Sequence, residues 1–524
     1  MCGLIFCEGE LEESKFLAAF NTIAHRGPDQ AIIHKDKHGI FGFHRLAIMD
    51  ISEKGMQPFI SDRLIVMCNG EIYNELYLKE VFSKYPFTSH SDCEVLLPLY
   101  LEYGAKMGPY LDAECAFVIY DKELDIVVAG RDPIGIRPLF YGYLKDTGKI
   151  AFASEAKALI SLCDGIKPFP IGTIYYDGEW IRYTDIKEVT YQIKDEVLAL
   201  SKIKHKLMDA VKKRMMSDVP IGYLLSGGLD SSLVCAIAGR YTKQPIVTFA
   251  IGMENDAIDL KYAKLVADHI GSKHYEVTMS FKDVLEALPY VIYHLETYDI
   301  TTIRASLGMY LLARYIKEKT DIKVILTGEI SDELFGYKYT DFAPSAEAFQ
   351  KESAKRLEEL YEYDVLRADR CIAAWSLEAR VPFGDLAFVK EVMAIDAELK
   401  LNKSGQGKYL LRKAFEKDKL LPESILWREK AAFSDAVGHS MVDQLKLKAE
   451  ELYSEEDVKS AYLKYPHNTP FTKESLWYRD MFETHYPAMS HLITDFWMPN
   501  KDWVGSDVKD PSARALSNYG DSGK

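Results

Sequence analysis

The sequence predicts an α+β domain in its first third, followed by an α/β domain with a doubly wound parallel sheet and a helical C-terminal part. Two observations support this prediction. Up to about residue 185, short apolar or alternating runs are separated by turn residues. From about residue 195, one apolar strand alternates with one amphipathic helix. The polar stretch 184–194 has no clear period, so we expect the domain boundary there.

The runs in the first domain have the length and patterning of buried or half-buried strands. A helical pattern at 94–103 interrupts them. Many short strands with few helices favour a layered α+β domain with much antiparallel pairing. The expected strands cover residues 63–68, 116–121, 125–130, 150–153 and 172–177.

In the second domain the regular alternation of strand and helix predicts parallel strands joined by crossover helices. Helices dominate from about residue 343, and the end of the chain is rich in Asp, Ser and Gly, which predicts a flexible tail. We therefore expect domains at 2–185 and 195–500 and a tail at 501–524. The expected elements are helix 197–216, strand 221–225, helix 231–241, strand 246–251, helix 260–270, strand 275–278 and strand 323–326.

Composition excludes several classes of partner. The chain has 524 residues and a net charge of −15, with no compensating basic stripe, so neither nucleic acid nor an anionic membrane is an expected partner. The eight cysteines are scattered without a C-x-x-C pair, which is typical of a reduced, cytoplasmic protein and gives no zinc motif. Neither a membrane span nor an export signal is indicated.

The loop 226–232, S-G-G-L-D-S-S, leaves an apolar strand and opens a helix. Free backbone N–H groups and the helix dipole bind phosphate at such a place. The loop has no lysine and so is not a Walker-type loop. A simple capped turn is the alternative, but the motif resembles the pyrophosphate loop of the ATP pyrophosphatase family, whose members adenylate a substrate.

A second acidic loop, T-G-E-I-S-D-E at 327–333, follows another predicted parallel strand. Ligands of such sheets bind at the carboxyl edge. Asp230 and Asp332 are therefore candidate Mg²⁺ ligands on a pyrophosphate, because hard cations bind carboxylate oxygens. Taken alone, such an acidic cluster is more often a capped helix start on a solvated face.

Cys2 becomes a nucleophile with its own base if the initiator Met is removed. The α-amine and the thiol have similar pKa values, about 8 and 8.5, so proton transfer between them costs little. By itself, cysteine at the second position is as easily an accident as a catalyst. The side-chain amide of Asn69 and the N–H of Gly70 are, however, suitable donors to a tetrahedral oxyanion.

Charged residues near these positions could recognise a free amino acid. Arg45 can bind an α-carboxylate through its planar fork, and Glu71 and Asp92 can accept hydrogen bonds from an α-ammonium group. Taken singly, such a residue is more often part of a surface turn or an ion pair. Together they indicate a site that cleaves a side-chain amide.

Several motifs identify the chain as resembling class II glutamine amidotransferases and, over nearly its whole length, the glutamine-hydrolysing asparagine synthetases. They are M-C-G at 1–3, H-R-G-P-D at 25–29, R-L at 45–46, N-G-E-I-Y-N at 69–74, S-D-C-E at 91–94, R-D-P-I-G at 131–135, the loop 226–232, Y-D-I-T-T-I-R-A-S at 298–306, E-A-R-V-P-F at 378–383 and W-R-E-K at 427–430.

This resemblance implies a four-layer αββα domain of the N-terminal nucleophile type, then a synthetase domain, in a cytoplasmic enzyme that is often a homodimer. Glutamine would be hydrolysed and aspartate converted to β-aspartyl-AMP with ATP and Mg²⁺. The implied catalytic residues are Cys2, Asn69, Gly70 and Glu329. The implied glutamine-binding residues are Arg45, Leu46, Ile48, Asn69, Gly70, Glu71 and Asp92. The implied ATP-binding residues are Leu224, Ser226, Gly228, Asp230, Ser231, Ile251, Thr327, Gly328 and Lys430, with Thr301 and Arg304 on the aspartate side.

Some positions depart from the usual pattern of that family. Ile330 stands where glycine is common, and Leu307-Gly308 stand where Thr-Pro is usual. Further departures are Thr327, Tyr337, Gly384 and Ala436. Two alternatives therefore stay open: a related ATP-dependent amidotransferase with a different carboxylate acceptor, and a non-catalytic relative.

Overall fold

The computed structural model describes residues 1–255, 257–403, 405–429 and 439–519. The chain divides into two compact units. The first comprises residues 1–186, 216–220 and 373–379, and the second comprises residues 187–215, 221–372 and 380–524. No helix among the described residues has both the length and the apolar character needed to cross a bilayer.

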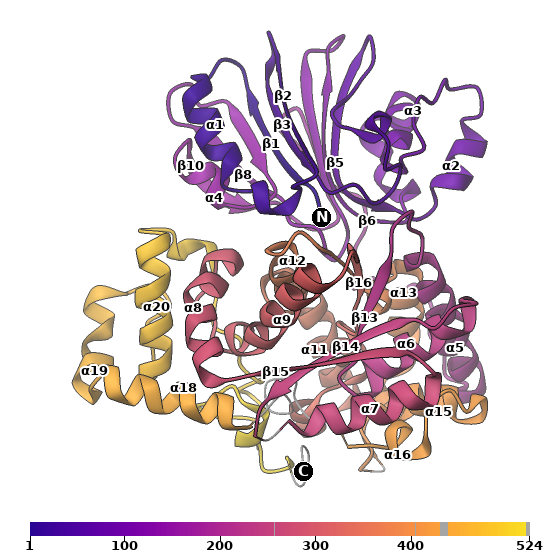
Figure 1. Ribbon diagram of the computed structural model, residues 1–524, viewed down its shortest axis with the longest axis vertical. Coiled ribbons are helices and arrows are strands. Elements are labelled where there is room, and N and C mark those ends of the chain that lie inside the picture. The colour runs from indigo at the N-terminus through magenta and orange to yellow at the C-terminus, as the bar shows by residue number, and fades with distance from the viewer. Residues whose placement is uncertain (256, 404, 430–438, 520–524) are drawn as a thin grey trace. The chain divides into compact units, whose positions relative to one another are not determined.

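Two six-stranded antiparallel sheets form the centre of the first unit (Figure 1). One has the order β10-β8-β9-β1-β3-β2, and the other has the order β12-β11-β7-β6-β5-β4. The strands are β1 (Gly3–Glu8), β2 (Gln30–Asp36), β3 (Gly39–Arg45), β4 (Phe59–Ile60), β5 (Leu64–Ile72), β6 (Ala113–Asp121), β7 (Ile126–Arg131), β8 (Phe140–Leu144), β9 (Ile150–Ala153), β10 (Cys163–Pro168), β11 (Thr173–Tyr176) and β12 (Glu179–Arg182).

Helices cover the outer faces of both sheets. Helices α1 (Glu13–Asn21) and α4 (Lys157–Ile160) lie on the first sheet, and α2 (Glu75–Val81) and α3 (Leu96–Tyr103) lie on the second. On β5, Ile65 and Met67 point into the core between the sheets, and Val66 and Cys68 pack toward the helices. The predicted four-layer αββα fold is confirmed.

The second unit contains a five-stranded sheet of order β15-β14-β13-β16-β17. The pairs β13–β14, β13–β16 and β14–β15 are parallel. The strands are β13 (Ile221–Leu224), β14 (Val247–Met253), β15 (Lys273–Met279), β16 (Val324–Leu326) and β17 (Glu378–Arg380), of which Arg380 belongs to this unit. The prediction of an α/β domain with a parallel sheet is confirmed.

Helices lie on both faces of this sheet, with α7 against one face of β14 and α9 against the other (Figure 1). The helices of the unit are α5 (Glu196–Arg214), α6 (Leu229–Tyr241), α7 (Ile258–Ile270), α8 (Phe281–Leu295), α9 (Ile300–Lys319), α10 (Ser331–Phe335), α11 (Ala346–Glu359), α12 (Asp364–Ala373), α13 (Leu386–Ala394), α14 (Ala397–Lys400), α15 (Tyr409–Phe415), α16 (Glu423–Leu426), α18 (His439–Leu452), α19 (Glu455–Lys464) and α20 (Lys473–His485).

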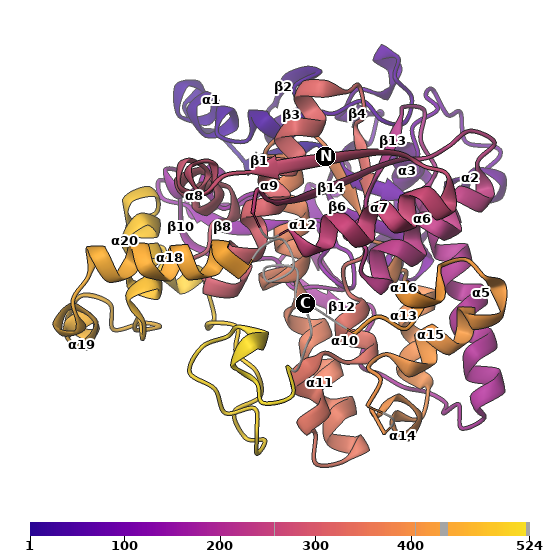
Figure 2. The ribbon, with the colours of Figure 1, turned by 60° about the horizontal axis from the view of Figure 1, so that its bottom comes forward.

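Helices α18, α19 and α20 stand together, and the irregular C-terminal segment follows them, drawn in yellow in Figure 2. We expected a flexible tail from residue 501, but Trp503, Ser506 and Leu516 are buried. Asn518 donates a hydrogen bond to the carbonyl oxygen of Lys338 at 2.7 Å. As far as residue 519, the segment is therefore packed, because three buried side chains anchor a stretch whose average composition is polar.

Candidate active sites

The first candidate site surrounds Cys2, directly before β1. Its Sγ accepts a hydrogen bond from the Leu46 amide at 3.4 Å and contacts the Leu46 carbonyl oxygen at 3.7 Å. Burial raises the pKa of the Cys2 thiol, whereas the amino terminus, the Leu46 amide and Arg45 lower it. The thiol therefore lies in a largely dry place beside positive charge, which suits a nucleophile that is deprotonated only when a base is present.

Asn69 and Gly70 lie on β5, and Asn69 continues the alternation of Ile65 and Met67. Its side chain therefore points to the same side of the sheet as the core that Cys2 packs against. Within the described residues, neither amide atom of Asn69 has a hydrogen-bond partner, although the residue is fully buried. A buried, unpaired amide is costly to maintain, so it indicates a ligand that is bound in the working state.

Gly70 allows the close approach of β6. A Cβ atom at this position would lie 2.2 Å from the Glu114 carbonyl oxygen and 2.5 Å from the Cys115 Cα atom. Its φ angle of +157° is also one that side chains rarely adopt. Glycine is therefore required where β5 carries the expected oxyanion donors.

Arg45 and Asp92 are both buried and held by the backbone. Arg45 donates to the Ser52 carbonyl oxygen at 2.7 Å and to the Gln30 side chain at 2.8 Å. Asp92 accepts from the Ile72 amide at 2.7 Å. Cys2 and Arg45 are close enough for each to shift the pKa of the other. The remaining predicted glutamine ligands, Leu46, Ile48 and Glu71, are buried as well.

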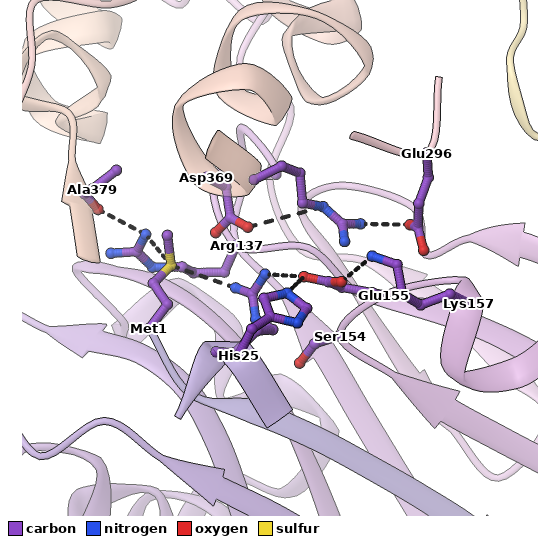
Figure 3. Close-up of polar contacts among 12 residues, drawn as sticks. Met1, His25, Arg137, Ser154, Glu155, Lys157, Glu296, Asp369 and Ala379 are labelled. Carbon is purple, nitrogen blue, oxygen red and sulfur yellow. Dashed lines mark hydrogen bonds and ion pairs between the residues drawn. The ribbon is translucent and has the colours of Figure 1, made fainter. Parts of the chain in front are cut away.

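An ion-pair cluster around Glu155, drawn in Figure 3, contacts the backbone of Cys2 through Arg26. Arg26 donates to the Cys2 carbonyl oxygen at 2.9 Å and to Glu155 at 2.6 Å. His25 and Lys157 also contact Glu155. His25 and Arg26 of the H-R-G-P-D motif therefore help to hold the backbone of the candidate nucleophile, which the sequence alone did not reveal.

Met1 is fully buried beside this cluster, and its Sδ lies 2.9 Å from Arg137 (Figure 3). Its α-amine is 3.9 Å from Glu378. Burial lowers the pKa of this amine to about 5. An amine in this environment is neutral near pH 7 and can accept a proton.

The second candidate site lies where β13 and β16 end. These strands are neighbours, so the loops that follow them, 225–228 and 327–330, open into the same cavity. Gly227 has a φ angle of +73°, and a Cβ atom there would lie 2.5 Å from the Ala263 nitrogen. Eight predicted ATP residues line this cavity: Leu224, Ser226, Gly228, Asp230, Ser231, Ile251, Thr327 and Gly328. The ninth, Lys430, lies outside the described residues, as does Ala436.

Hydrogen bonds give the first loop its shape. The Ser226 amide donates to the Ser231 hydroxyl at 3.2 Å, and the two hydroxyls are 3.0 Å apart. The Gly228 amide donates to the Ser226 hydroxyl at 3.3 Å. These contacts keep the loop folded at the start of α6, where the helix dipole favours an anion.

Lys408 is a residue of this site that our sequence analysis missed. Its Nζ lies 2.8 Å from both carboxylate oxygens of Asp230, 2.7 Å from Asp332 and 3.0 Å from the Ser331 hydroxyl. The side chain is buried. The signal was a lysine directly after glycine at the start of a helix, as in other phosphate sites.

Two further cations, Arg412 and Arg428, line the same cavity and were also missed. Arg428 donates to the Gly227 carbonyl oxygen at 3.1 Å and pairs with Asp259 at 3.1 Å. Burial lowers the pKa of Arg412 to about 10, so it stays charged near pH 7. Together with Lys408 they supply positive charge to a loop that has no Walker lysine.

Glu329 lies in the second loop and forms an ion pair with Arg367. Arg367 also binds Asp364 at 2.7 Å. The next residue, Ile330, has a φ angle of +80° and is buried. Glycine adopts this conformation without strain, whereas a β-branched residue is strained by about 1–3 kcal/mol, so packing must hold the loop here.

Thr301 and Arg304 lie on the first turns of α9 and line the cavity. The Asp299 carboxylate caps this helix by accepting from the Thr302 amide at 2.8 Å. The Thr301 hydroxyl is buried and has no partner among the described residues. Arg304, in contrast, makes four hydrogen bonds to protein groups and is considered further below.

Asp230 and Asp332 also fit a Mg²⁺ site. They are two carboxylates that face the same cavity beside the expected pyrophosphate loop, and Mg²⁺ in such sites binds one or two carboxylates and phosphate oxygens. The described residues contain no cluster of three or more such ligands that could hold a metal alone. A cation here would therefore bind together with a phosphate-bearing substrate.

Comparisons with known proteins agree with this division. A glutamine amidotransferase domain family matches residues 1–171, and an asparagine synthase family matches residues 202–349 and 341–503. A probable glutamine-hydrolysing asparagine synthetase of Dictyostelium discoideum is 42% identical and covers 98% of each chain. The glutamine-hydrolysing asparagine synthetase of Homo sapiens is 41% identical over 99% of each chain. Asparagine synthetase B of Escherichia coli is 40% identical over 91% of this chain and 89% of its own.

Proposed function

The chain belongs to the glutamine-hydrolysing asparagine synthetases, and on this premise we propose which of its residues carry each half of the reaction. As a member of that family it is a ligase that uses glutamine, aspartate and ATP and forms asparagine. The observation that best supports our assignment is that the expected residues gather in two sites, each within its own unit.

In the first site, Cys2 is the nucleophile. Its sulfur adds to the side-chain carbonyl carbon of glutamine, and the thiol proton passes to the Cys2 α-amine. The unpaired amide of Asn69 and the N–H of Gly70 then stabilise the oxyanion. The protonated amine then gives this proton to the leaving nitrogen, so that collapse expels ammonia and leaves a glutamyl thioester, which water hydrolyses to glutamate.

This mechanism requires removal of Met1, because only then does Cys2 carry a free amine. Burial lowers the pKa of the Met1 amine to about 5, and an amine kept neutral in this way near pH 7 has the free lone pair that the Cys2 amine would need to take up the thiol proton. Arg26 would keep the Cys2 carbonyl oxygen in place after removal. Arg45, Glu71 and Asp92 would hold the charged groups of glutamine, and Leu46 and Ile48 would line the site.

We expect the Asn69→Ala variant to hydrolyse glutamine about 10²- to 10³-fold more slowly, because one preorganised oxyanion donor is lost. Glutamate release measured at saturating glutamine tests this, and synthesis from ammonium salts should be unaffected. Asn74→Ala is the matched control, since that amide binds the backbone at Tyr110 and Asp112. A loss below about threefold for Asn69→Ala, or an equal loss for both variants, would remove Asn69 from the site.

In the second site, the β-carboxylate of aspartate attacks the α-phosphorus of ATP, and pyrophosphate leaves. Activation is needed because a carboxylate is a poor electrophile, whereas AMP is a good leaving group. Ammonia then attacks the acyl carbon and AMP departs. Leu224 and Ile251 would contact adenosine, and Ser226, Gly228, Ser231 and Lys430 would hold the pyrophosphate.

Glu329 would support formation and capture of the acyl adenylate, with Arg367 holding its carboxylate in place. Thr301 and Arg304 would lie on the aspartate side of the cavity. Asp230 and Asp332 would hold Mg²⁺, which when bound supplies positive charge to the pyrophosphate. Lys408 places a positively charged side chain of the protein at the same position.

Ammonia must reach the second site without being protonated, because ammonium is not a nucleophile. Near neutral pH in water it would be mostly protonated, so transfer inside the protein is a chemical requirement of coupling. We further propose a cytoplasmic location, supported by the absence of a disulfide among eight cysteines that are all described and all free. We also propose that the protein forms a homodimer, and the only support for this is the resemblance to the family.

The assay that tests this function supplies the purified chain with glutamine, aspartate, ATP and Mg²⁺. We expect equimolar glutamate, asparagine, AMP and pyrophosphate, measured by chromatography. Release of ADP and phosphate would contradict adenylation at the loop 226–232. Preference for another carboxylic acid over aspartate would contradict the acceptor, for which the altered residues Ile330 and Tyr337 in the cavity wall give a specific reason to test.

A further inference from the structure

Arg304 on α9 is surrounded by carboxylates and a hydroxyl from two C-terminal elements. Its Nε donates to Glu474 on α20 at 2.9 Å, and one terminal nitrogen donates to the other oxygen of the same carboxylate. The second terminal nitrogen donates to the Ser512 hydroxyl at 2.7 Å and to Asp510 at 3.3 Å. Arg304, Pro511 and Ser512 all line the cavity that holds Glu329.

This arrangement leaves few N–H donors of Arg304 available to a substrate. A guanidinium has five N–H donors. Glu474 takes the edge formed by Nε and one terminal nitrogen, and Asp510 and Ser512 take both donors of the other terminal nitrogen. A bidentate carboxylate needs two parallel N–H groups, so it can bind Arg304 only after Asp510 and Ser512 withdraw.

The two carboxylates differ in how easily they can withdraw. Glu474 is buried, belongs to a helix and also accepts from the Tyr478 hydroxyl at 2.7 Å. Asp510 is 28% exposed and belongs to a segment without regular helix or strand. Breaking the fully buried pair with Glu474 would cost more than breaking the pair with Asp510, which is partly exposed.

Asp510 also has a second cation to bind. Its other carboxylate oxygen lies 2.7 Å from Lys446 on α18. Burial raises the pKa of Asp510, but Arg304 and Lys446 together lower it by a larger amount. The pKa is therefore below its ordinary value, and the carboxylate is charged near pH 7. Asp510 can therefore release Arg304 and remain paired, which lowers the cost of the exchange.

We propose that Asp510 and Ser512 form a latch that occupies Arg304 in place of the substrate, and that the α-carboxylate of aspartate displaces this latch when it binds. The C-terminal segment then sets the affinity for aspartate. This inference rests on the proposed function, because it takes aspartate as the acceptor and Arg304 as its ligand. It assigns a role in specificity to residues 510–512, which lie about 200 positions from Arg304 in the chain.

The test compares Asp510→Asn with Lys446→Met, for which the proposal predicts opposite effects. Asp510→Asn removes the competing charge, so the KM for aspartate should fall about three- to tenfold with kcat changed less than twofold. Lys446→Met leaves Asp510 with Arg304 alone, so the KM for aspartate should rise about threefold. Ammonium chloride supplies the nitrogen, which makes the assay independent of Cys2.

Asp507→Asn is the matched control, because it makes the same chemical change at an exposed side chain of the same segment. The KM for aspartate of this control variant should equal that of wild type. The KM for ATP should be unchanged in all three variants. A higher KM for aspartate in Asp510→Asn would overturn the latch and show instead that Asp510 orients Arg304 for binding. An unchanged KM in both Asp510→Asn and Lys446→Met would also overturn it.

Failure of the proposed function would be visible separately. In that case the wild-type chain forms no asparagine from ammonium, aspartate and ATP. Equilibrium dialysis with radiolabelled aspartate then compares wild type with Asp510→Asn without turnover. Tighter binding by Asp510→Asn supports the latch, and equal or weaker binding overturns it.

Discussion

Replacing Cys2 by alanine is expected to abolish asparagine formation from glutamine and to leave formation from ammonium salts largely intact. The Cys2 thiol is the group that forms the thioester in the proposed mechanism, so glutamine hydrolysis should fall about 10⁴-fold or more. The second site has its own cavity and its own residues within the other unit, and ammonium provides the nitrogen without Cys2. Parallel assays with glutamine and with ammonium chloride measure both activities.

Cys7→Ala is the matched control for this result. Cys7 lies on β1, five positions from Cys2, and its side chain is buried in the core. Its loss should affect stability slightly and neither activity specifically. If Cys2→Ala lost both activities while its thermal unfolding matched that of wild type, the assignment of one half-reaction to each unit would be wrong.

The sequence was informative where function depends on residues that are close together in the chain. The loops 226–232 and 327–333 each contain their own turn, helix start and charged groups, so their position at the ends of β13 and β16 could be predicted. The predicted strand 150–153 agrees with β9, and strand 221–225 differs from β13 by one residue. Local pattern was enough in these cases.

Strand β1 could not be predicted from the sequence, for a physical reason. Both faces of this strand are covered, so five of its six residues are buried and no alternation is left to recognise. The hydrogen bond from Arg26 to the Cys2 carbonyl oxygen could not be predicted for a different reason. A short motif does not indicate which distant backbone group its arginine will contact.

Long-range contacts explain why some residues around the second site were not predicted. Lys408 meets Asp230 across 178 positions in sequence, and Arg304 meets Ser512 across 208. The composition of residues 501–524 suggested disorder, yet Trp503 and Leu516 are buried. A few apolar side chains are enough to hold a polar segment against the protein when other elements provide a surface for them to pack on. The average composition of the segment does not indicate whether such a surface exists.

Among these long-range contacts, the contact of Lys408 with Asp230 is the one whose loss should affect activity most, and the Lys408→Met variant removes it. Lys408 is the cation between Asp230 and Asp332, and its removal leaves two carboxylates of like charge facing each other and the incoming pyrophosphate. Losing one preorganised group that stabilises developing charge typically lowers the rate by about 10²- to 10³-fold. We therefore expect ammonium-dependent asparagine synthesis to fall about 10²- to 10³-fold.

Two comparisons separate this effect from misfolding. Glutamine hydrolysis occurs in the other unit, so in Lys408→Met it should change less than threefold, which glutamate release measures. Lys413→Met is the matched control, because Lys413 lies on the same helix α15 and pairs with Glu416 at its surface. Retention of more than a third of the synthetase activity by Lys408→Met would mean that Asp230 and Asp332 bind the nucleotide without this lysine. An equal fall in both activities would point to a general loss of structure, because the charge that Lys408 supplies acts only on the site at the ends of β13 and β16.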